Sequence, residues 1–263
     1  MVKYLSIGPG SMGYFIYLGL LSKMKNDRLL DELLEISGAS AGGLLAFIYC
    51  IFKGDTSKSL DYSLNAPVKT IMKPNIKNLL LNYGLISTNR IRKLLEKLCI
   101  QLMDKDPTFE DLYNWFPVKL HISAFCLDLN KTIYFSVDTT PSMKVIDAVC
   151  ATIAMPLLFS PLKLSDGWHY IDGGTAETVP GGPFLGKGEG VLCLKLDWGK
   201  FFPIKDIKTY LSSVLYSTMK LRYQYAFPNI SINIDDTDLF DYGTSNETKL
   251  RLFIVGQSHK FSI

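Results

Sequence analysis

The order of the predicted elements indicates an α/β protein built on a mostly parallel sheet that helices cover. Tyr4 to Ile7 is a short apolar stretch typical of a buried strand, and a helical stretch follows from about Ser11 to Lys25. A second apolar stretch, Leu33 to Ile36, precedes another helical stretch from Ala41 to Phe52. This alternation predicts parallel strands side by side, with the connecting helices packed on them.

Glycine, proline and short polar residues set the boundaries of these four elements. The first strand stops at Gly8-Pro9-Gly10, and the helix after it ends near Asn26-Asp27. Gly38 is predicted to break the second strand, and Gly54 to stop the second helix.

The rest of the chain alternates less regularly, but each predicted element has a local signal. Apolar residues at helical spacing predict a helix from Ser87 or Thr88 through Leu98, and Thr108 and Asp111 are spaced to cap a helix that ends at Trp115. The further elements are strands at 118–127 and 132–137 joined by a turn at 128–130, a helix at 143–154, a strand leading into Asp172, a strand at 191–196 and a helix at 207–222.

One apolar segment leaves two interpretations open. Leu79 to Leu81 and Leu85-Ile86 would either form an apolar rim that docks on lipid or pack inside the protein as a buried helix. Buried packing is the favoured interpretation.

Composition and charge exclude several classes of protein. The 263 residues are 48% hydrophobic and 20% charged, which is ordinary for a globular protein with a sizeable core, and we expect one domain over residues 1–263. The net charge of +3 is too small to indicate a nucleic-acid-binding protein. The five cysteines are widely spaced in apolar surroundings, which predicts reduced core residues and neither a disulfide framework nor a zinc site. They are Cys50, Cys99, Cys126, Cys150 and Cys193.

The apolar stretches are short. The longest run, Leu44 to Phe52, is well below the roughly 18 residues that would suggest a membrane crossing. Gly8-Pro9-Gly10 interrupts the apolar stretch that a signal peptide would need. We therefore expect a cytoplasmic protein, or one bound peripherally at a membrane surface.

Gly38 to Gly42 is a Gly-x-Ser-x-Gly pattern between a predicted strand and a predicted helix. A sharp turn at this junction exposes the Ser40 hydroxyl at the sheet edge, and the flanking Gly38 and Gly42 are needed because the backbone there is crowded. The N-terminus of the following helix favours the negative charge that develops during acyl transfer. The pattern indicates a nucleophilic serine, with a glycine-rich turn that has no chemistry as the alternative.

Gly8 to Gly13 is a second glycine-rich segment, which lies between the first strand and the first helix. Backbone N–H groups at such a junction bind an anion or an oxyanion. The segment also matches the Gly-x-Gly-x-x-Gly fingerprint of dinucleotide-binding folds, which place an acidic residue at the tip of the second strand. Because that strand ends in Ile36-Ser37-Gly38, the dinucleotide interpretation is disfavoured.

Asp172-Gly173-Gly174 is the third segment, and it follows the apolar Tyr170-Ile171. Glycines beside a carboxylate leave the acid reachable and let the backbone pass close to a neighbouring loop. By itself, the segment is more typical of a tight turn that happens to contain an aspartate.

Taken together and in this order, the three segments resemble the patatin-like phospholipases. That family has a glycine-rich oxyanion loop after its first strand, then Gly-x-Ser-x-Gly, and much later an Asp-Gly-Gly with the partner aspartate. A fourth segment, Ala151 to Pro161, is similar to the family's Ala-x-x-Ala-x-Pro-x-x-Phe-x-Pro pattern just before the aspartate. The resemblance covers about Tyr4 to Pro180, and the last third of the chain carries no motif that matches.

The resemblance implies a three-layer α/β/α sandwich with a central, mostly parallel sheet and a nucleophile elbow. It also implies a serine esterase that cleaves fatty acyl esters of phospholipids or related lipids through an acyl-enzyme on Ser40, with Asp172 as the base. This chemistry needs no metal and no cofactor, and the implied partner is a lipid substrate, met at a membrane surface or in solution. The implied supporting residues are Gly8, Gly10, Ser11 and Gly13 in the oxyanion loop, Gly38 and Gly42 in the elbow, and Gly173 and Gly174 in the acid motif.

The chain departs from the family pattern at three positions. Pro9 stands where the loop has a glycine, Met12 where it has arginine or lysine, and Thr178 where the acid motif continues with asparagine. Proline has no N–H to donate, so the expected oxyanion donors are the amides of Gly10 and Ser11. The departures bear on the substrate more than on the mechanism.

Two alternatives remain at this point. The first is an α/β-hydrolase esterase with a Ser40-Asp172-His259 triad, whose chain order matches, although only two predicted strands precede Ser40. His121 and His169 have ordinary interpretations as a strand residue and a loop residue. The second is a catalytically dead lipid-binding protein on the same scaffold, which Pro9 and Met12 make conceivable.

Overall fold

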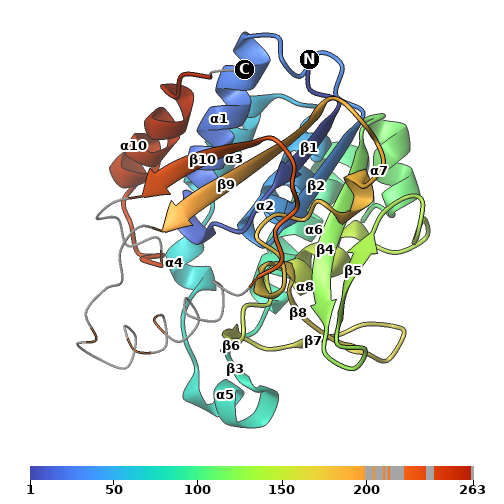
Figure 1. The fold of residues 1–263 in the computed structure, drawn as a ribbon. Helices are drawn as coiled ribbons and strands as arrows, with labels where there is room; N and C mark the ends of the chain where they lie inside the picture. The colour runs from blue at the N-terminus through green and yellow to red at the C-terminus, as the bar shows by residue number, and fades with distance from the viewer. Residues whose placement is uncertain (199–203, 205–209, 211–212, 214–221, 235–239, 262–263) are drawn as a thin grey trace.

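A central sheet organises the computed structural model, which describes residues 1–198, 204, 210, 213, 222–234 and 240–261 (Figure 1). Among these residues, eight strands form the sheet, and the pairs β10–β9, β9–β1, β1–β2 and β2–β4 are all parallel. Across the sheet the strands are β10 (Asn229–Ile234), β9 (Val191–Trp198), β1 (Tyr4–Ile7), β2 (Glu35–Ala39), β4 (Lys119–Cys126), β8 (His169–Asp172) and β7 (Leu162–Lys163), with β5 (Lys131–Phe135) also paired to β4. The pairs β4–β5, β4–β8 and β7–β8 are antiparallel.

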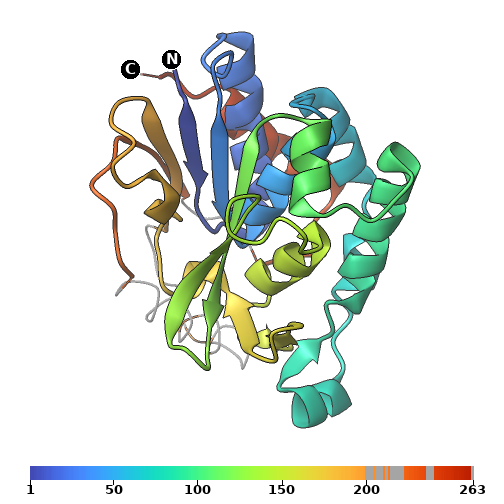
Figure 2. The ribbon, with the colours of Figure 1, turned by 90° about the vertical axis from the view of Figure 1, so that its right-hand side faces the viewer.

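Helices cover one face of this sheet. The helices are α1 (Tyr14–Asn26), α2 (Ala41–Ile51), α3 (Thr56–Asn65), α4 (Val68–Ile71), α5 (Ile76–Asn82), α6 (Asn89–Met103), α7 (Phe109–Trp115), α8 (Val145–Thr152) and α10 (Asn246–Gln257), with short 3-10 turns η1 (Ser11–Gly13), η2 (Gly173–Thr175) and η3 (Gly182–Phe184). In Figure 2 the blue α1, the red α10 and the teal α6 stand on the same side of the blue strands. Parallel neighbours such as β1 and β2 need a crossover connection, which is usually a helix, and α1 is that helix here.

The first helix is buried on nearly all sides. Every residue of α1 from Tyr14 to Ser22 is buried, since the helix lies between the sheet and α10. Two glycines allow this close contact: a Cβ on Gly19 would lie 2.0 Å from the Phe253 carbonyl oxygen, and a Cβ on Gly256 would lie 2.0 Å from the Ile16 carbonyl oxygen. The backbones of the two helices therefore touch without intervening side chains.

The other face of the sheet is covered by the segment between β8 and β9. The Ser37 hydroxyl donates to the Pro180 carbonyl oxygen over 2.6 Å, and the ring of Phe184 lies edge-on to His121 at 6.0 Å. Figure 2 shows this gold segment, with its short turn, on the side of the sheet opposite the helices. The sheet is thus enclosed on both faces, which explains why β2 is buried at every position.

The predicted fold class, α/β with a mostly parallel central sheet, is confirmed. The strand Tyr4–Ile7 and the helix Phe109–Trp115 have the predicted bounds, and Thr108 and Asp111 form the expected capping box. The five cysteines are buried and reduced, as predicted. The helix predicted at 207–222 lies almost entirely outside the described residues.

Two expectations are wrong. The second strand begins at Glu35, two residues later than predicted, and continues through Gly38 to Ala39. Gly38 does not break it because parallel hydrogen bonds to β1 and β4 hold the backbone extended up to the turn. The second error is the buried packing favoured for residues 79–81: Leu80 and Leu81 on α5 are each 75% exposed.

The α5 helix is attached to the body by a small second sheet. Its two strands, β3 (Gly84–Ile86) and β6 (Leu157–Phe159), pair in parallel. Among the described residues, no helix has the length and apolar character that crossing a bilayer requires.

Candidate active site

Ser40 lies at the sharp turn from β2 into α2. Its backbone has φ 55° and ψ −126°, a region that residues with a side chain rarely adopt. A Cβ on Gly38 would lie 2.4 Å from the Gly42 carbonyl oxygen, and a Cβ on Gly42 would lie 2.3 Å from the Ile7 carbonyl oxygen. Glycine at both positions is therefore what lets the turn close and presents the Ser40 hydroxyl beyond the end of β2.

Asp172 is in direct contact with Ser40. The Ser40 Oγ donates to Asp172 Oδ2 over 2.6 Å, and the Gly174 N–H donates to Asp172 Oδ1 over 2.7 Å. Both carboxylate oxygens therefore have a neutral donor, and the aspartate side chain is fixed beside the serine. Sequence positions 132 residues apart meet here because β8 and β2 flank the same strand, β4.

Burial sets the protonation of Asp172. The residue is 4% exposed, and loss of hydration raises the pKa of its carboxyl group from 3.8 to about 6. The hydrogen bonds from Ser40 and Gly174 and the charge of Arg222 act in the opposite direction and limit the rise. A carboxylate with a pKa near 6 is ionised at neutral pH and accepts a proton more readily than an ordinary aspartate.

The four residues predicted for the oxyanion loop divide into two groups. The Gly8 N–H donates to the Leu194 carbonyl oxygen over 2.9 Å, and the Gly13 N–H donates to the Gly10 carbonyl oxygen over 2.7 Å. These two amides already make backbone hydrogen bonds, which favours a role for Gly8 and Gly13 in shaping the loop. Gly10 and Ser11 both line the cavity that contains Ser40 and Asp172.

Tyrosine hydroxyls bond to this loop, in which Met12 stands at the position that is basic in the family the sequence resembles. The Tyr17 hydroxyl donates to the Pro9 carbonyl oxygen over 3.1 Å, and the Ser11 hydroxyl donates to the Tyr242 hydroxyl over 2.7 Å. Pro9 also packs on the acid motif, since a Cβ on Gly174 would lie 2.6 Å from the Pro9 Cβ. The loop, the elbow and the acid motif are thus in mutual contact.

Thr152 is a site residue that the sequence interpretation missed. Its hydroxyl oxygen accepts the Ser40 N–H over 2.8 Å and is fully buried. The Ser40 amide is therefore engaged, and the strained turn is held from the α8 side. The only available signal was the position of Thr152 inside the Ala151-to-Pro161 motif, which does not reveal its partner.

The three histidines bond or stack elsewhere. His121 Nε2 lies 2.9 Å from Glu35 Oε2, and the His169 backbone and ring contact Asp128. The ring of His259 stacks edge-on against Phe261 at 5.7 Å. Among the described residues, none of the three histidines lines the cavity that contains Ser40 and Asp172.

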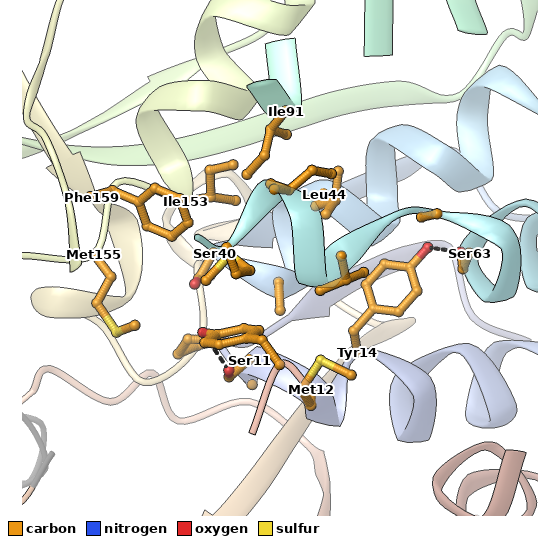
Figure 3. Close-up of a pocket in the computed structure, with 18 of the residues that line it drawn as sticks. Ser11, Met12, Tyr14, Ser40, Leu44, Ser63, Ile91, Ile153, Met155 and Phe159 are labelled. Atoms are coloured by element: carbon orange, nitrogen blue, oxygen red, sulfur yellow. Dashed lines mark hydrogen bonds between the residues drawn. The ribbon is translucent and has the colours of Figure 1, made fainter. Parts of the chain in front are cut away.

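The cavity around Ser40 is mainly apolar. Figure 3 shows Leu44, Ile153 and Phe159 around Ser40, with Ile91 further along the same wall. Among the described residues that line it, Asp172 and Arg222 are the charged ones. The described residues contain no group of three potential metal ligands. Such a cavity suits an apolar chain whose polar end lies at the serine.

Comparisons with known proteins identify the family of the chain. A family model described as patatin-like phospholipase matches residues 5–185. Over 184 residues the chain is 26% identical to the probable lipid hydrolase 463L of Invertebrate iridescent virus 6, a match that covers 68% of this chain and 61% of that protein. The chain thus spans less than two thirds of that relative's length.

A solved structure shares the fold. The crystal structure of VipD from Legionella pneumophila matches with a TM-score of 0.55 and 17% identity, over 96% of this chain and 67% of that chain. At this level of identity the likeness concerns the fold, and the chemistry must be argued from the site itself.

Proposed function

Because the chain belongs to the patatin-like phospholipase family, we propose that it is a lipid hydrolase that cleaves fatty acyl esters of phospholipids or related lipids. The observation that carries the proposal is the 2.6 Å hydrogen bond from Ser40 to Asp172. It lies in an apolar cavity, at a strained turn after a parallel strand. A nucleophile in contact with a base is the arrangement that acyl transfer requires.

The proposed reaction has two halves. Asp172 takes the proton of the Ser40 hydroxyl as the serine oxygen attacks the ester carbonyl carbon, and the carbonyl oxygen becomes an oxyanion. The tetrahedral intermediate collapses, the C–O bond to the alcohol breaks, and Asp172 returns the proton to the leaving alcohol. Water then attacks the acyl-enzyme on Ser40, with Asp172 again accepting and returning a proton, and the fatty acid leaves.

Backbone amides would stabilise the oxyanion. Gly10 and Ser11 line the cavity, and the amides of Gly8, Gly13 and Ser40 are engaged elsewhere. The N-terminus of α2, which starts at Ala41, adds a positive partial charge beside the serine. These two features support an oxyanion hole between the loop and the elbow.

The cavity lining supports a lipid substrate. Its walls offer aliphatic and aromatic side chains to an acyl chain, and Arg222 offers a positive charge close enough to Asp172 to lower the pKa of that carboxyl group. A phosphate near the scissile ester would meet this guanidinium. We further propose that residues 1–263 form one patatin-like domain, since strands from Tyr4 to Ile234 share one sheet.

Mass spectrometry of the intact protein tests the proposal. A chromogenic short-chain ester should acylate Ser40 and be turned over, and Ser40→Ala should lose both the adduct and the turnover. A wild-type protein that binds lipid without turning over any ester would instead indicate the catalytically dead lipid-binding protein. An adduct at another serine would overturn the assignment of the nucleophile.

A further inference from the structure

The α5 region is the most exposed apolar part of the described surface. We call residues 72–86, which contain α5 and β3, the tip. Figures 1 and 2 both draw α5 at one end of the molecule, projecting away from the sheet. Four of its side chains have the largest exposed fractions among the described large hydrophobic residues: Ile76 at 72%, Leu80 and Leu81 at 75%, and Tyr83 at 73%.

Three of these side chains lie on the short helix α5, and Tyr83 is the C-cap residue directly after it. Ile76 and Leu80 are four residues apart and therefore neighbours on one helical face, and Leu81 and Tyr83 follow directly. No residue of α5 is buried. Exposed apolar side chains close together on a surface are typical of a site that binds another protein or a membrane.

Charge around the tip identifies the kind of partner. Between Tyr62 and Leu95 the chain has six basic residues and no acidic one, and the rest of the chain has three more acidic than basic residues. Lys69, Lys73 and Lys77 are exposed on or beside the tip. An apolar helix flanked by lysines matches an anionic bilayer, whose headgroups attract the charges and whose acyl region accepts the side chains.

The tip is continuous with the wall of the active-site cavity. Ile71 and Met72, directly before α5, line the cavity. On the other side of α5, Ile86 of β3 pairs with Phe159 of β6, which also lines it. A surface that binds at the tip therefore lies next to the cavity that holds Ser40.

The tip is held firmly on the body. The side-chain amide of Asn78 donates to the Ser160 hydroxyl of the body over 3.0 Å, and within the tip it donates to the Gly84 carbonyl oxygen over 2.6 Å. A Cβ on Gly84 would lie 2.2 Å from the Phe159 carbonyl carbon, so the two strands are in backbone contact. Docking at the tip would thus fix the orientation of the cavity relative to the bound surface.

We propose that the tip is the surface by which this protein docks on an anionic phospholipid bilayer, with Ile76, Leu80, Leu81 and Tyr83 in the interface and Lys69, Lys73 and Lys77 against lipid phosphates. The proposal rests on the proposed function, because the bilayer is then the source of the lipid substrate. It assigns the encounter with lipid to a site outside the catalytic residues.

Vesicle sedimentation tests the proposal, using Ser40→Ala protein so that the lipid stays intact. The protein should sediment with phosphatidylcholine vesicles that contain phosphatidylserine and much less with pure phosphatidylcholine. Leu80→Ser combined with Leu81→Ser should weaken binding roughly tenfold or more. Each lysine-to-glutamine change at Lys69, Lys73 or Lys77 should weaken it about fivefold, less at high salt.

A matched control uses another pair of exposed apolar neighbours on a helix. Ile254 and Val255 on α10 are 54% and 49% exposed, so changing both to serine removes similar surface elsewhere. This control should bind vesicles like the parent protein. Equal binding by the Leu80→Ser, Leu81→Ser variant and its parent would overturn the proposal, and so would equal losses in the variant and the control.

A soluble ester separates this proposal from the proposed function. With Ser40 present, the tip variant should hydrolyse a monomeric short-chain ester at the wild-type rate and lose activity only on vesicles. A wild-type protein that is inactive on every ester but needs the tip to bind vesicles would refute the proposed function and leave the docking surface standing. Loss of self-association in the tip variant, with vesicle binding unchanged, would show that the tip is a protein interface and overturn the proposal.

Discussion

Two buried carboxylates lie near the two ends of strand β2, and their partners differ. Glu35 begins the strand, with Oε2 2.9 Å from His121 Nε2 and Oε1 2.8 Å from Lys187 Nζ. Asp172 contacts Ser40, directly after the strand ends, and accepts hydrogen bonds from a hydroxyl and a backbone amide. The exposed fractions, 6% for Glu35 and 4% for Asp172, are nearly the same, so burial does not distinguish the two acids.

The partners decide the protonation. Burial by itself would raise the pKa of Glu35, but the hydrogen bonds and charges of His121 and Lys187 outweigh it and lower the pKa to about 2. For Asp172 burial dominates over its neutral donors and the charge of Arg222, and the pKa rises to about 6. Glu35 is therefore fixed as an anion across the working pH range, whereas Asp172 can exchange a proton near neutrality.

The two carboxylates should affect stability with opposite signs. The folded pKa of Asp172 lies above its unfolded value, so its favourable contribution exists at low pH and is lost as the pH rises from about 4 through 6. The folded pKa of Glu35 lies below its unfolded value, so its contribution is present above about 4.5 and is lost as the pH falls towards 2. The ionised Asp172 carboxylate thus lowers the stability of the folded protein at neutral pH, whereas the ion pairs of Glu35 at the other end of the strand raise it.

Asp172→Asn should give the largest effect and the clearest contrast. Turnover should fall on the order of ten-thousandfold, because the base is lost. The free energy of unfolding should nevertheless rise by up to about 3 kcal/mol at neutral pH, because no buried charge remains, and the gain should vanish near pH 4. Ester hydrolysis and urea unfolding at the two pH values measure both. Substantial turnover, or a less stable protein at neutral pH, would contradict the assignment.

Glu35→Gln should have the opposite pair of effects, a lower stability with turnover nearly unchanged. Removing this carboxylate leaves Lys187 and His121 without their anion, and the free energy of unfolding should fall by about 3 kcal/mol at neutral pH. Turnover of a soluble ester at a temperature where the variant is folded should change little. Glu32→Gln, which alters an exposed glutamate, is the control and should shift stability by no more than about 0.5 kcal/mol. A large loss of turnover in Glu35→Gln would mean that the two ends of the strand are coupled.

Thr152→Val should reduce turnover by acting at Ser40, and it should leave the ion pairs of Glu35 at the other end of β2 unchanged. Valine keeps the shape of the side chain but cannot accept the Ser40 N–H, and leaving that amide unsatisfied should reduce turnover about tenfold. Thr152→Ser retains the hydroxyl and should restore most of the rate. If valine and serine reduce turnover equally, packing and not the hydrogen bond explains the residue.

Arg222→Gln should produce the smallest change. Its positive charge lowers the pKa of Asp172, so removing it should move the acidic limb of kcat/KM to higher pH by less than about one unit. Arg90→Gln, at an exposed position on α6, should leave the limb in place. A limb that moves to lower pH in Arg222→Gln would show that the guanidinium does not act on Asp172.

Local patterns predicted the structural features that neighbouring residues build. The sharp turn between strand and helix at Ser40 and the capping box at Thr108 are each set by neighbours within a few positions, and the structure has both where the sequence predicts them. The pairing of Glu35 with His121 could not be predicted, because it depends on the register that sets Ser37 opposite His121 in β2 and β4. Thr152 was missed for the same reason: its partner lies 112 residues away.

At the tip, the error is not a missed contact: the sequence pattern favoured burial where the structure shows exposure. A run of three leucines predicts burial when only composition is considered, and here the helix that carries them extends beyond the body. Exposure is a property of the whole fold, so a short apolar run does not reveal whether it faces the core or an external partner.

The pH dependence of Ser40 labelling tests the central claim most directly, that a buried Asp172 activates this serine. A fluorophosphonate should modify Ser40, with a rate that reaches half its maximum near pH 6 in the wild type and in Glu35→Gln, and Asp172→Asn should hardly react. Labelling of Asp172→Asn at the wild-type rate, or its loss in His259→Ala, would contradict the dyad and favour a histidine base.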